Sequence, residues 1–189
     1  MKRIGILGDI GSGKSYVSKC FGYPVFNADL EVGKIYKKDK NTFKKLKKKL
    51  PTHFESFPIK KDDIVNAILE NKNNLRKIVK IVHFEVRKKL SNFLKENRNK
   101  KVVVLDIPLL LENGMNKKSD ILIFVDSEEF EINKRLKKRK NFNPKLFRNF
   151  KKIQLSLDLK KKRSQFIIKN NFKKNSVTIK VRKILRNIL

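Results

Sequence analysis

The sequence predicts an α/β fold, a doubly wound parallel sheet of five strands with helices on both faces. Short apolar segments alternate with longer segments whose apolar residues recur at helical spacing. Two short segments, 102–105 and 121–125, are apolar throughout, as is typical of strands buried on both faces of a parallel sheet. A glycine-rich motif also joins the first expected strand to the first expected helix. With 189 residues, the chain is long enough for one domain with a substantial core.

The elements follow from the same patterns, in chain order. Strands are expected at 2–7, 24–26, 102–105, 121–125 and 165–169. Helices are expected at 15–21, 30–49, 128–138, 144–162 and 176–188, with two more inside 62–99. Pro51 should end the second helix, and 52–60 should be a loop. Ligands of such sheets bind at the carboxyl ends of the strands. That edge would carry Gly8, Asp29, Asp106, Asp126 and Asn170.

The glycine-rich motif matches G-x-x-x-x-G-K-[ST], the pattern of a phosphate-binding loop. Its residues are Gly8, Asp9, Ile10, Gly11, Ser12, Gly13, Lys14 and Ser15. Glycines let backbone N–H groups approach phosphate oxygens closely, and the following helix would direct its positive end at the same anion. The motif therefore predicts a nucleoside triphosphate site, the alternative being a chance glycine-rich turn.

Two side chains of this motif carry chemistry of their own. Lys14 can supply positive charge to the β and γ phosphates, and the Ser15 hydroxyl can join the oxygen shell of a magnesium ion. Asp9 brings a negative charge beside the phosphates and is expected to point away from them.

Composition limits the classes of function. The net charge of +31 comes from 39 lysines and 10 arginines, and alanine occurs only twice. We attribute this mainly to an A+T-rich coding sequence, which produces abundant lysine, asparagine, isoleucine and phenylalanine with little alanine. RNA or DNA binding is less favoured, because the lysines spread over every expected helix and form no single stripe. The single cysteine, Cys20, excludes an internal disulfide and a multi-cysteine zinc site. No signal peptide or membrane span is expected, so a soluble cytoplasmic protein is predicted.

From end to end, the chain resembles the dephospho-coenzyme A kinases. The segments that carry the resemblance are GDIGSGKS at 8–15, FNADLEV at 26–32, IVHFEVR at 81–87, LDIPLLLENG at 105–114, DILIFVD at 120–126, NKRLKKR at 133–139 and QLSLDLKKKRSQFIIKNN at 154–171. The phosphate loop alone identifies only a superfamily, whereas the ordered set is much more specific.

The resemblance implies transfer of the γ-phosphoryl group of ATP to the ribose 3′-hydroxyl of dephospho-coenzyme A, with magnesium. It also implies a P-loop kinase fold in one domain. The core would comprise 1–50, 100–134 and 163–189, with a helical coenzyme-binding insertion at about 61–99 and a lid at about 135–150. The partners would be these two small substrates, without a membrane and without nucleic acid.

Catalytic roles follow residue by residue. Asp29 matches the second aspartate of the family's Asp-Ala-Asp string and would accept the proton of the attacking hydroxyl; it could instead only complement a helix dipole. Arg139 matches the lid arginine, which stabilises charge on the transferring phosphoryl group, although it could be a solvated surface charge. Arg135 is a second lid candidate for ATP binding.

The acceptor site would draw on His83 and Arg87, which match a His-Pro-x-x-Arg motif, on Lys61 and on Asp106. His83 could instead be structural, and Asp106 could orient magnesium or only cap its strand. Asn170, with Asn171, could lie near the adenine or form a turn. The chain departs from the family pattern at Asn27, which replaces an aspartate, at Phe84, which replaces a proline, and at Lys61, which replaces an arginine.

Two other functions compete with this one. The first is a kinase of the same fold for another small hydroxyl acceptor, a nucleoside or nucleotide. The second is a nucleotide-dependent RNA-binding protein without catalysis. Asp29 and the lid arginines favour a kinase, since a passive binder needs no proton acceptor.

Overall fold

The computed structural model describes residues 1–139 and 142–189. The chain forms two compact units. We call residues 1–27, 96–142 and 153–189 the sheet unit, and residues 28–95 and 143–152 the helical unit. Residues 28–50 were expected to belong to the core, but their contacts place them in the helical unit together with residues 61–95. None of the helices in the described ranges has the length and apolar character needed to span a bilayer.

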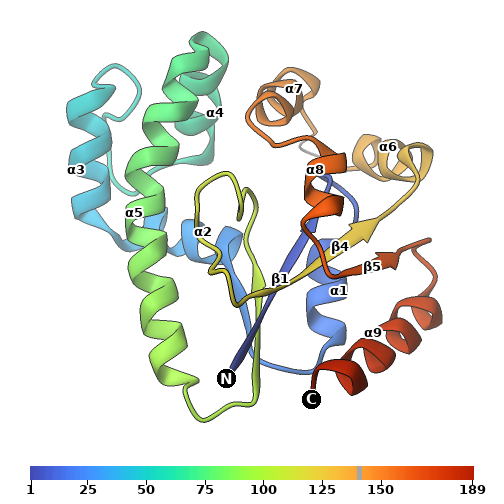
Figure 1. Ribbon diagram of the computed structural model, residues 1–189. Helices are drawn as coiled ribbons and strands as arrows, with labels where there is room; N and C mark the ends of the chain where they lie inside the picture. Colours follow the sequence, from blue (N-terminus) through green and yellow to red (C-terminus); the bar gives the residue numbers. More distant parts are fainter. Residues whose placement is uncertain (140–141) are drawn as a thin grey trace. The chain divides into compact units, whose positions relative to one another are not determined.

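The sheet unit contains a five-stranded sheet that is parallel throughout the described residues, in the order β2-β3-β1-β4-β5 (Figure 1). Its strands are β1 (Lys2–Gly8), β2 (Val25–Asn27), β3 (Val102–Asp106), β4 (Ile121–Asp126) and β5 (Phe166–Lys169). All five expected strands are confirmed to within a residue or so at each end. Because every strand runs the same way, their carboxyl ends meet at one edge of the sheet.

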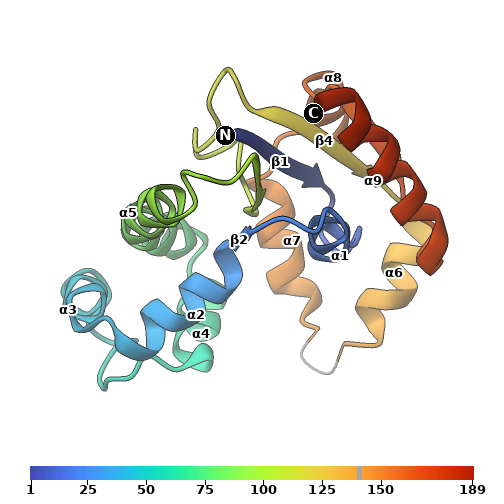
Figure 2. The ribbon, with the colours of Figure 1, turned by 90° about the horizontal axis from the view of Figure 1, so that it is seen from below.

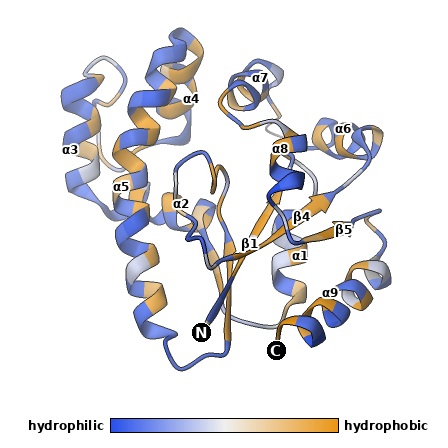
Figure 3. Ribbon diagram, in the orientation of Figure 1, coloured by the Kyte–Doolittle hydropathy of each residue, from blue (hydrophilic) through white to orange (hydrophobic). Residues whose placement is uncertain are grey.

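Both faces of the sheet are covered. Two helices, α1 (Lys14–Cys20) and α9 (Lys174–Ile188), bury Val17, Val177 and Val181 against one face, where they meet Ile6 and Ile123. A short helix, α8 (Leu157–Lys162), packs on β1, and Figures 1 and 2 show it on the face opposite α1. Figure 3 shows the strands in hydrophobic colours, in line with the expected doubly buried sheet.

The helical unit contains α2 (Ala28–Lys38), α3 (Lys40–Lys49), α4 (Lys61–Glu70), α5 (Lys72–Glu96) and α7 (Pro144–Lys152), which contacts α4. Two helices in the 62–99 stretch and a loop over 52–60 were expected, and both are confirmed.

The single helix expected over 30–49 is wrong, because the structure has α2 and α3 with a break at Asp39. The Asp39 carboxylate accepts the backbone N–H groups of Asn41 and Thr42 at 2.9 and 3.0 Å. These bonds satisfy first-turn amides that a new helix leaves without partners, so Asp39 starts α3 as its N-cap.

The helix expected over 144–162 is wrong in the same way. The chain forms α7, a connection over 153–156, and then α8. Ser156 caps α8 by accepting the Leu159 N–H at 3.3 Å. The other helix of the sheet unit, α6 (Glu129–Lys137), agrees with the expectation, and α9 begins two residues earlier than expected.

Candidate functional site

The phosphate loop lies at the carboxyl end of β1, in the centre of the sheet. β1 ends at Gly8 and α1 begins at Lys14, so the residues between them form the turn that the motif predicts. Gly13 has a φ of +89°, a conformation that L side chains rarely adopt, and it immediately precedes α1. The N-terminal end of α1 therefore follows directly on the loop, and a helix start in this position can bind an anion.

Side chains from two neighbouring strand ends hold the loop in place. The Asn170 side-chain amide donates to the Ser12 carbonyl oxygen at 2.8 Å, and the Ser127 hydroxyl donates to the same oxygen at 3.0 Å. Asn170 is 2% exposed, and a Cβ on Gly13 would lie only 2.4 Å from its side-chain nitrogen. Asn170, which was predicted to bind ATP, thus braces the loop through the Ser12 carbonyl group.

Helix α6 packs against the same loop from the side. A Cβ on Gly11 would meet Ile132 and Leu136 of this helix at 3.0 and 3.2 Å. One turn of α6 also presents Arg135, whose guanidinium carbon lies 4.3 Å from the centroid of the Phe172 ring. A cation at this distance over an aromatic face is attracted to it. Arg135 is therefore held near the loop by Phe172, and its role in ATP binding stays a prediction.

Sequence reasoning missed Ser127 and Phe172. Ser127 directly follows the Asp126 that ends β4, and Phe172 directly follows the Asn-Asn pair after β5. Because both strands were expected to end at the binding edge, the residues that follow them could have been predicted to lie near the phosphate loop. Phe172 has a φ of +61°, which is unusual for a residue other than glycine, and its N–H donates to the Asn170 side chain at 3.0 Å.

The charged side chains of the loop form hydrogen bonds to the loop's own backbone. The Lys14 ammonium donates to the carbonyl oxygens of Asp9 and Gly8 at 2.6 and 3.3 Å. The Asp9 carboxylate is buried and accepts the Ile10 N–H at 2.7 Å. Ser15 is exposed in the first turn of α1. Lys14 thus lies over the turn, where an anionic ligand would meet its charge.

A second polar pair lies where β2 and β3 end. Asn27 and Asp106 are partners in the register of these strands, and the Asn27 amide donates to the Asp106 carboxylate at 2.7 Å. Asp106 is 3% exposed. A buried charge needs hydrogen bonds to compensate its lost hydration, and this amide supplies one. The asparagine that departs from the family pattern therefore contacts a predicted site residue directly.

Asp29 is the second residue of α2 and follows Asn27 by two positions. Its side chain is exposed. It lies in the first turn of the helix, where a negative charge is favourable in any case. The dipole alternative therefore keeps its physical basis, and the role of Asp29 as proton acceptor stays a prediction.

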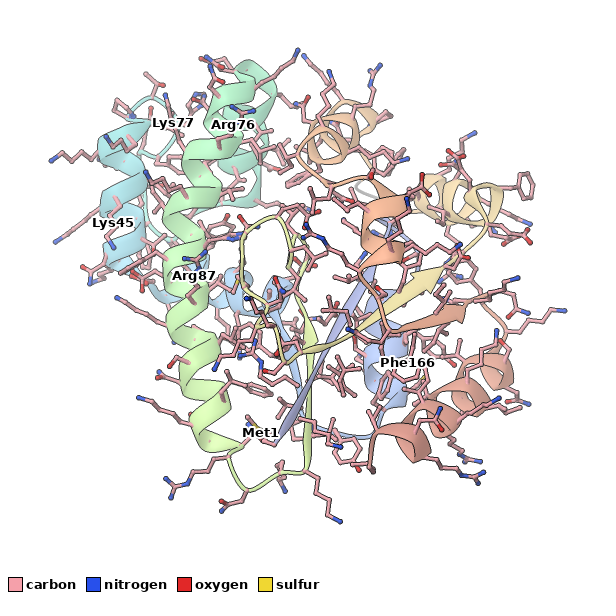
Figure 4. The ribbon with its side chains drawn as sticks, viewed as in Figure 1. Met1, Lys45, Arg76, Lys77, Arg87 and Phe166 are labelled. Carbon is pink, nitrogen blue, oxygen red and sulfur yellow. The ribbon has the colours of Figure 1, made fainter. Side chains whose placement is uncertain are left out.

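The predicted acceptor residues of the helical unit are on α4 and α5. Lys61 is the exposed first residue of α4. Burial, and secondarily the positive charge of Arg87, lower the pKa of His83 below its ordinary value. The buried Nδ1 of His83 has no hydrogen-bond partner among the described residues. His83 is therefore neutral at pH 7, and the positive charge of this motif belongs to Arg87, which Figure 4 shows on α5.

Phe84 replaces the expected proline on α5 and is 54% exposed. The ammonium groups of Lys45 and Lys88 lie 5.0 and 4.5 Å from the centre of its ring. Both lysines also pair with Glu85, at 3.1 and 3.3 Å. The substitution thus places an aromatic ring directly after His83 in the chain, and two lysine ammonium groups lie over that ring.

The structure brings together one subset of the predicted residues. The loop, Arg135 and Asn170 form one continuous arrangement in the sheet unit, and Asp106 ends a strand of the same sheet. Arg139 is exposed just after α6, with its N–H bonded to the Leu136 carbonyl. Two residues of the expected lid, Lys140 and Asn141, lie outside the described residues. Asp29, Lys61, His83 and Arg87 belong to the helical unit.

Comparison with known proteins identifies one family. The sequence model of the dephospho-CoA kinases matches residues 2–175. A dephospho-CoA kinase of Wolbachia sp. subsp. Brugia malayi is 31% identical over 190 residues, covering 98% of this chain and 97% of the relative. One from Bartonella henselae is 34% identical over 173 residues, covering 89% of this chain and 88% of the relative.

Solved structures agree on the fold. The crystal structure of TT1252 from Thermus thermophilus superposes with a TM-score of 0.78 at 24% identity, over 100% of this chain and 97% of that one. A dephospho-CoA kinase from Campylobacter jejuni gives a TM-score of 0.63 at 20% identity, over 99% of this chain and 97% of that one. A shikimate kinase from Bacteroides thetaiotaomicron gives 0.55 at 14% identity, over 99% and 98%. The expected kinase fold is confirmed.

Proposed function

The chain belongs to the dephospho-CoA kinase family, and we propose that it transfers the γ-phosphoryl group of ATP to the ribose 3′-hydroxyl of dephospho-CoA. The observation that carries this proposal is the phosphate loop, formed at the central strand and braced by Asn170. The relatives, similar over nearly the whole chain, favour this acceptor over a nucleoside or another small alcohol. ATP and dephospho-CoA as substrates favour the cytoplasm as the place of reaction.

On this proposal, the ATP phosphates bind the backbone N–H groups between Gly8 and Ser15. Lys14 would exchange its two carbonyl partners for phosphate oxygens, so that its charge meets the γ-phosphoryl group. Arg135 would lie beside the nucleotide, because it is already held against Phe172 near the loop. Arg139 would stabilise the charge that develops on the transferring group.

Asp29 would orient the attacking hydroxyl and accept its proton. Its exposure in the first turn of α2 supports access to a substrate. Proton acceptance by a positioned carboxylate typically contributes about 100-fold or more to a rate. Because no bond of the protein is made or broken, the remaining catalysis consists of positioning and electrostatic stabilisation.

The residues present fit magnesium bound with ATP. No group of three or more His, Cys, Asp or Glu side chains in residues 1–139 and 142–189 could hold a metal, but magnesium bound to a nucleotide needs only one or two protein oxygens. The exposed Ser15 hydroxyl, in the first turn after the loop, suits such an ion. When bound, magnesium neutralises charge on the β and γ phosphates.

The acceptor would be recognised by charge and by hydrogen bonds. Dephospho-CoA is an anion, and Lys61 and Arg87 offer positive charge on α4 and α5. His83, neutral at pH 7, would offer a hydrogen bond. Asp106, held by Asn27, would contact the ribose hydroxyls as a fixed acceptor.

A coupled assay of ADP release tests the proposal. The purified protein is supplied with ATP and magnesium and with dephospho-CoA, adenosine or short nucleotides as acceptors. Turnover with dephospho-CoA, and formation of CoA by mass spectrometry, is expected. Turnover with a nucleoside but none with dephospho-CoA would replace the proposal by the other kinase function. RNA binding without any turnover would favour the passive binder, and it should weaken steeply with salt.

A further inference from the structure

A buried ion pair in the sheet unit has no part in the proposed chemistry. Lys160, on α8, is the only buried lysine among the residues whose burial is described. Its ammonium lies 2.8 Å from Oε1 of Glu112, and the two side chains are 4% and 9% exposed. Burying two charges costs hydration energy that their attraction often does not recover, so a gain in stability does not by itself explain this pair.

The pair holds a particular stretch of backbone. Oε1 of Glu112 also accepts the Leu155 N–H at 3.0 Å, and the Lys160 ammonium donates to the Gln154 side chain at 3.1 Å. Gln154 and Leu155 belong to the connection 153–156, where the chain returns from α7 to the sheet unit. Glu112 itself lies six residues after Asp106, in the segment that follows β3.

Two attachments therefore define the stretch that carries Arg139. On one side, Ile132 and Leu136 of α6 pack on the phosphate loop at Gly11. On the other, Glu112 and Lys160 fix residues 154 and 155. Between these attachments the chain leaves the sheet unit and comes back to it.

We propose that Glu112 is a positioning residue for phosphoryl transfer, which fixes the returning connection 153–156 through its bond to the Leu155 N–H while Lys160 compensates its charge. The inference rests on the proposed function, in which Arg139 acts on the transferring group. Glu112 does not touch the reacting atoms; it sets where the second end of the Arg139 stretch is held.

Two matched double variants separate positioning from stability. Glu112→Gln with Lys160→Met removes both charges but keeps a side-chain oxygen that can accept the Leu155 N–H. Glu112→Met with Lys160→Met removes both charges and the acceptor. Both avoid the unpaired buried charge that a single substitution would leave, and replacing buried pairs by neutral residues is often tolerated. The control is Lys161→Met, which lies on the same helix as Lys160 and breaks an exposed pair with Asp126 at the end of β4.

The measurements are the melting temperature, kcat and KM with dephospho-CoA, and hydrogen exchange of a peptide containing residues 153–156. The Gln/Met variant and the control should keep kcat within about threefold of the original protein. The Met/Met variant should lose about tenfold in kcat, the size expected for the loss of one hydrogen bond, while ATP affinity stays within about threefold. Its 153–156 peptide should exchange faster, and the two double variants should melt within a few degrees of each other.

Equal kcat in the two double variants would overturn the proposal. A tenfold loss of kcat in a folded Gln/Met variant would also overturn it, and this outcome can be measured even if the Met/Met protein does not fold. Faster exchange at 153–156 without a loss of kcat would also overturn it. If the unsubstituted protein does not phosphorylate dephospho-CoA, the proposed function fails separately. The exchange comparison, repeated with and without ATP, then decides whether Glu112 fixes the connection.

Discussion

The hydrogen bond between Asn170 and the phosphate loop predicts that Gly13→Ala weakens nucleotide binding strongly. The loss should be much larger than the one expected from backbone strain alone. Gly13 has a φ of +89°, and a Cβ there would lie 2.4 Å from the Asn170 side-chain nitrogen. Gly22 has a φ of +70°, and a Cβ there would meet nothing within 4 Å, so Gly22→Ala shares the strain without the collision. The two substitutions form a matched pair.

The magnitude follows from the contacts. Placing alanine in a left-handed conformation costs about 1–2 kcal/mol at either glycine. At Gly13 the collision also displaces the Asn170 amide from the Ser12 carbonyl, a bond of 2.8 Å at a side chain that is 2% exposed. Losing it adds about 1–3 kcal/mol, since a buried polar group loses a partner. Gly13→Ala should therefore weaken ATP binding about 10- to 100-fold, whereas Gly22→Ala should change it by less than about threefold.

Urea unfolding and titration with a fluorescent ATP analogue measure the two effects. Asn170→Ala combined with Gly13→Ala should cost less than the two single changes together, because the shortened side chain no longer meets the new Cβ. Equal ATP affinities for Gly13→Ala and Gly22→Ala, or full additivity with Asn170→Ala, would refute the reasoning.

Three further predictions concern the other predicted residues. Asp29→Asn should lower kcat by about 100-fold and leave ATP affinity similar, and unchanged turnover in the coupled assay would remove Asp29 as the proton acceptor. Asn27→Ala should lower kcat about tenfold, because the buried Asp106 carboxylate loses an amide donor at 2.7 Å; activity equal to the original would show that this bond does not position the carboxylate. The pKa of His83 is lower in the folded protein than in the unfolded chain, so the unfolded chain takes up the proton first as the pH falls. The neutral His83 therefore contributes its full stabilisation above pH 6.5, and this stabilisation is lost as the pH falls below 6.5. Urea unfolding at about pH 7.5 and about pH 5.5 should therefore show a smaller acid loss for His83→Asn than for the original, and equal losses would contradict the buried neutral state.

Local signals in the sequence predict much of this fold and the phosphate loop. The loop motif is a contiguous string, and its geometry depends on nearby backbone. The doubly buried strands are equally local, because each is apolar along its whole length. The helix breaks at Asp39 and Ser156 were missed because apolar residues continue at helical spacing across them, although both residues are typical N-caps. These capping residues could have predicted the two helix starts, but the continuous apolar spacing was given more weight.

Contacts between distant segments could not be predicted in the same way. Asn27 meets Asp106 only because β2 lies beside β3 in a register that pairs these two positions, and no local pattern specifies that register. Phe172 meets Arg135 only because β5 ends beside the loop against which α6 packs.

Lys160 shows the limit most clearly, since nothing in a run of lysines marks which one is buried against Glu112. Its neighbours on α8, Lys161 and Lys162, have the same side chain and are exposed. What distinguishes Lys160 is the direction in which one short helix faces the sheet, together with a carboxylate 48 positions earlier in the chain. Charge composition predicts a solvated surface on average, but a single buried exception has to be compensated by its own partner. For that reason the effect of removing Glu112 should depend on its bond to the Leu155 N–H, and the overall charge of the protein should have little influence on it.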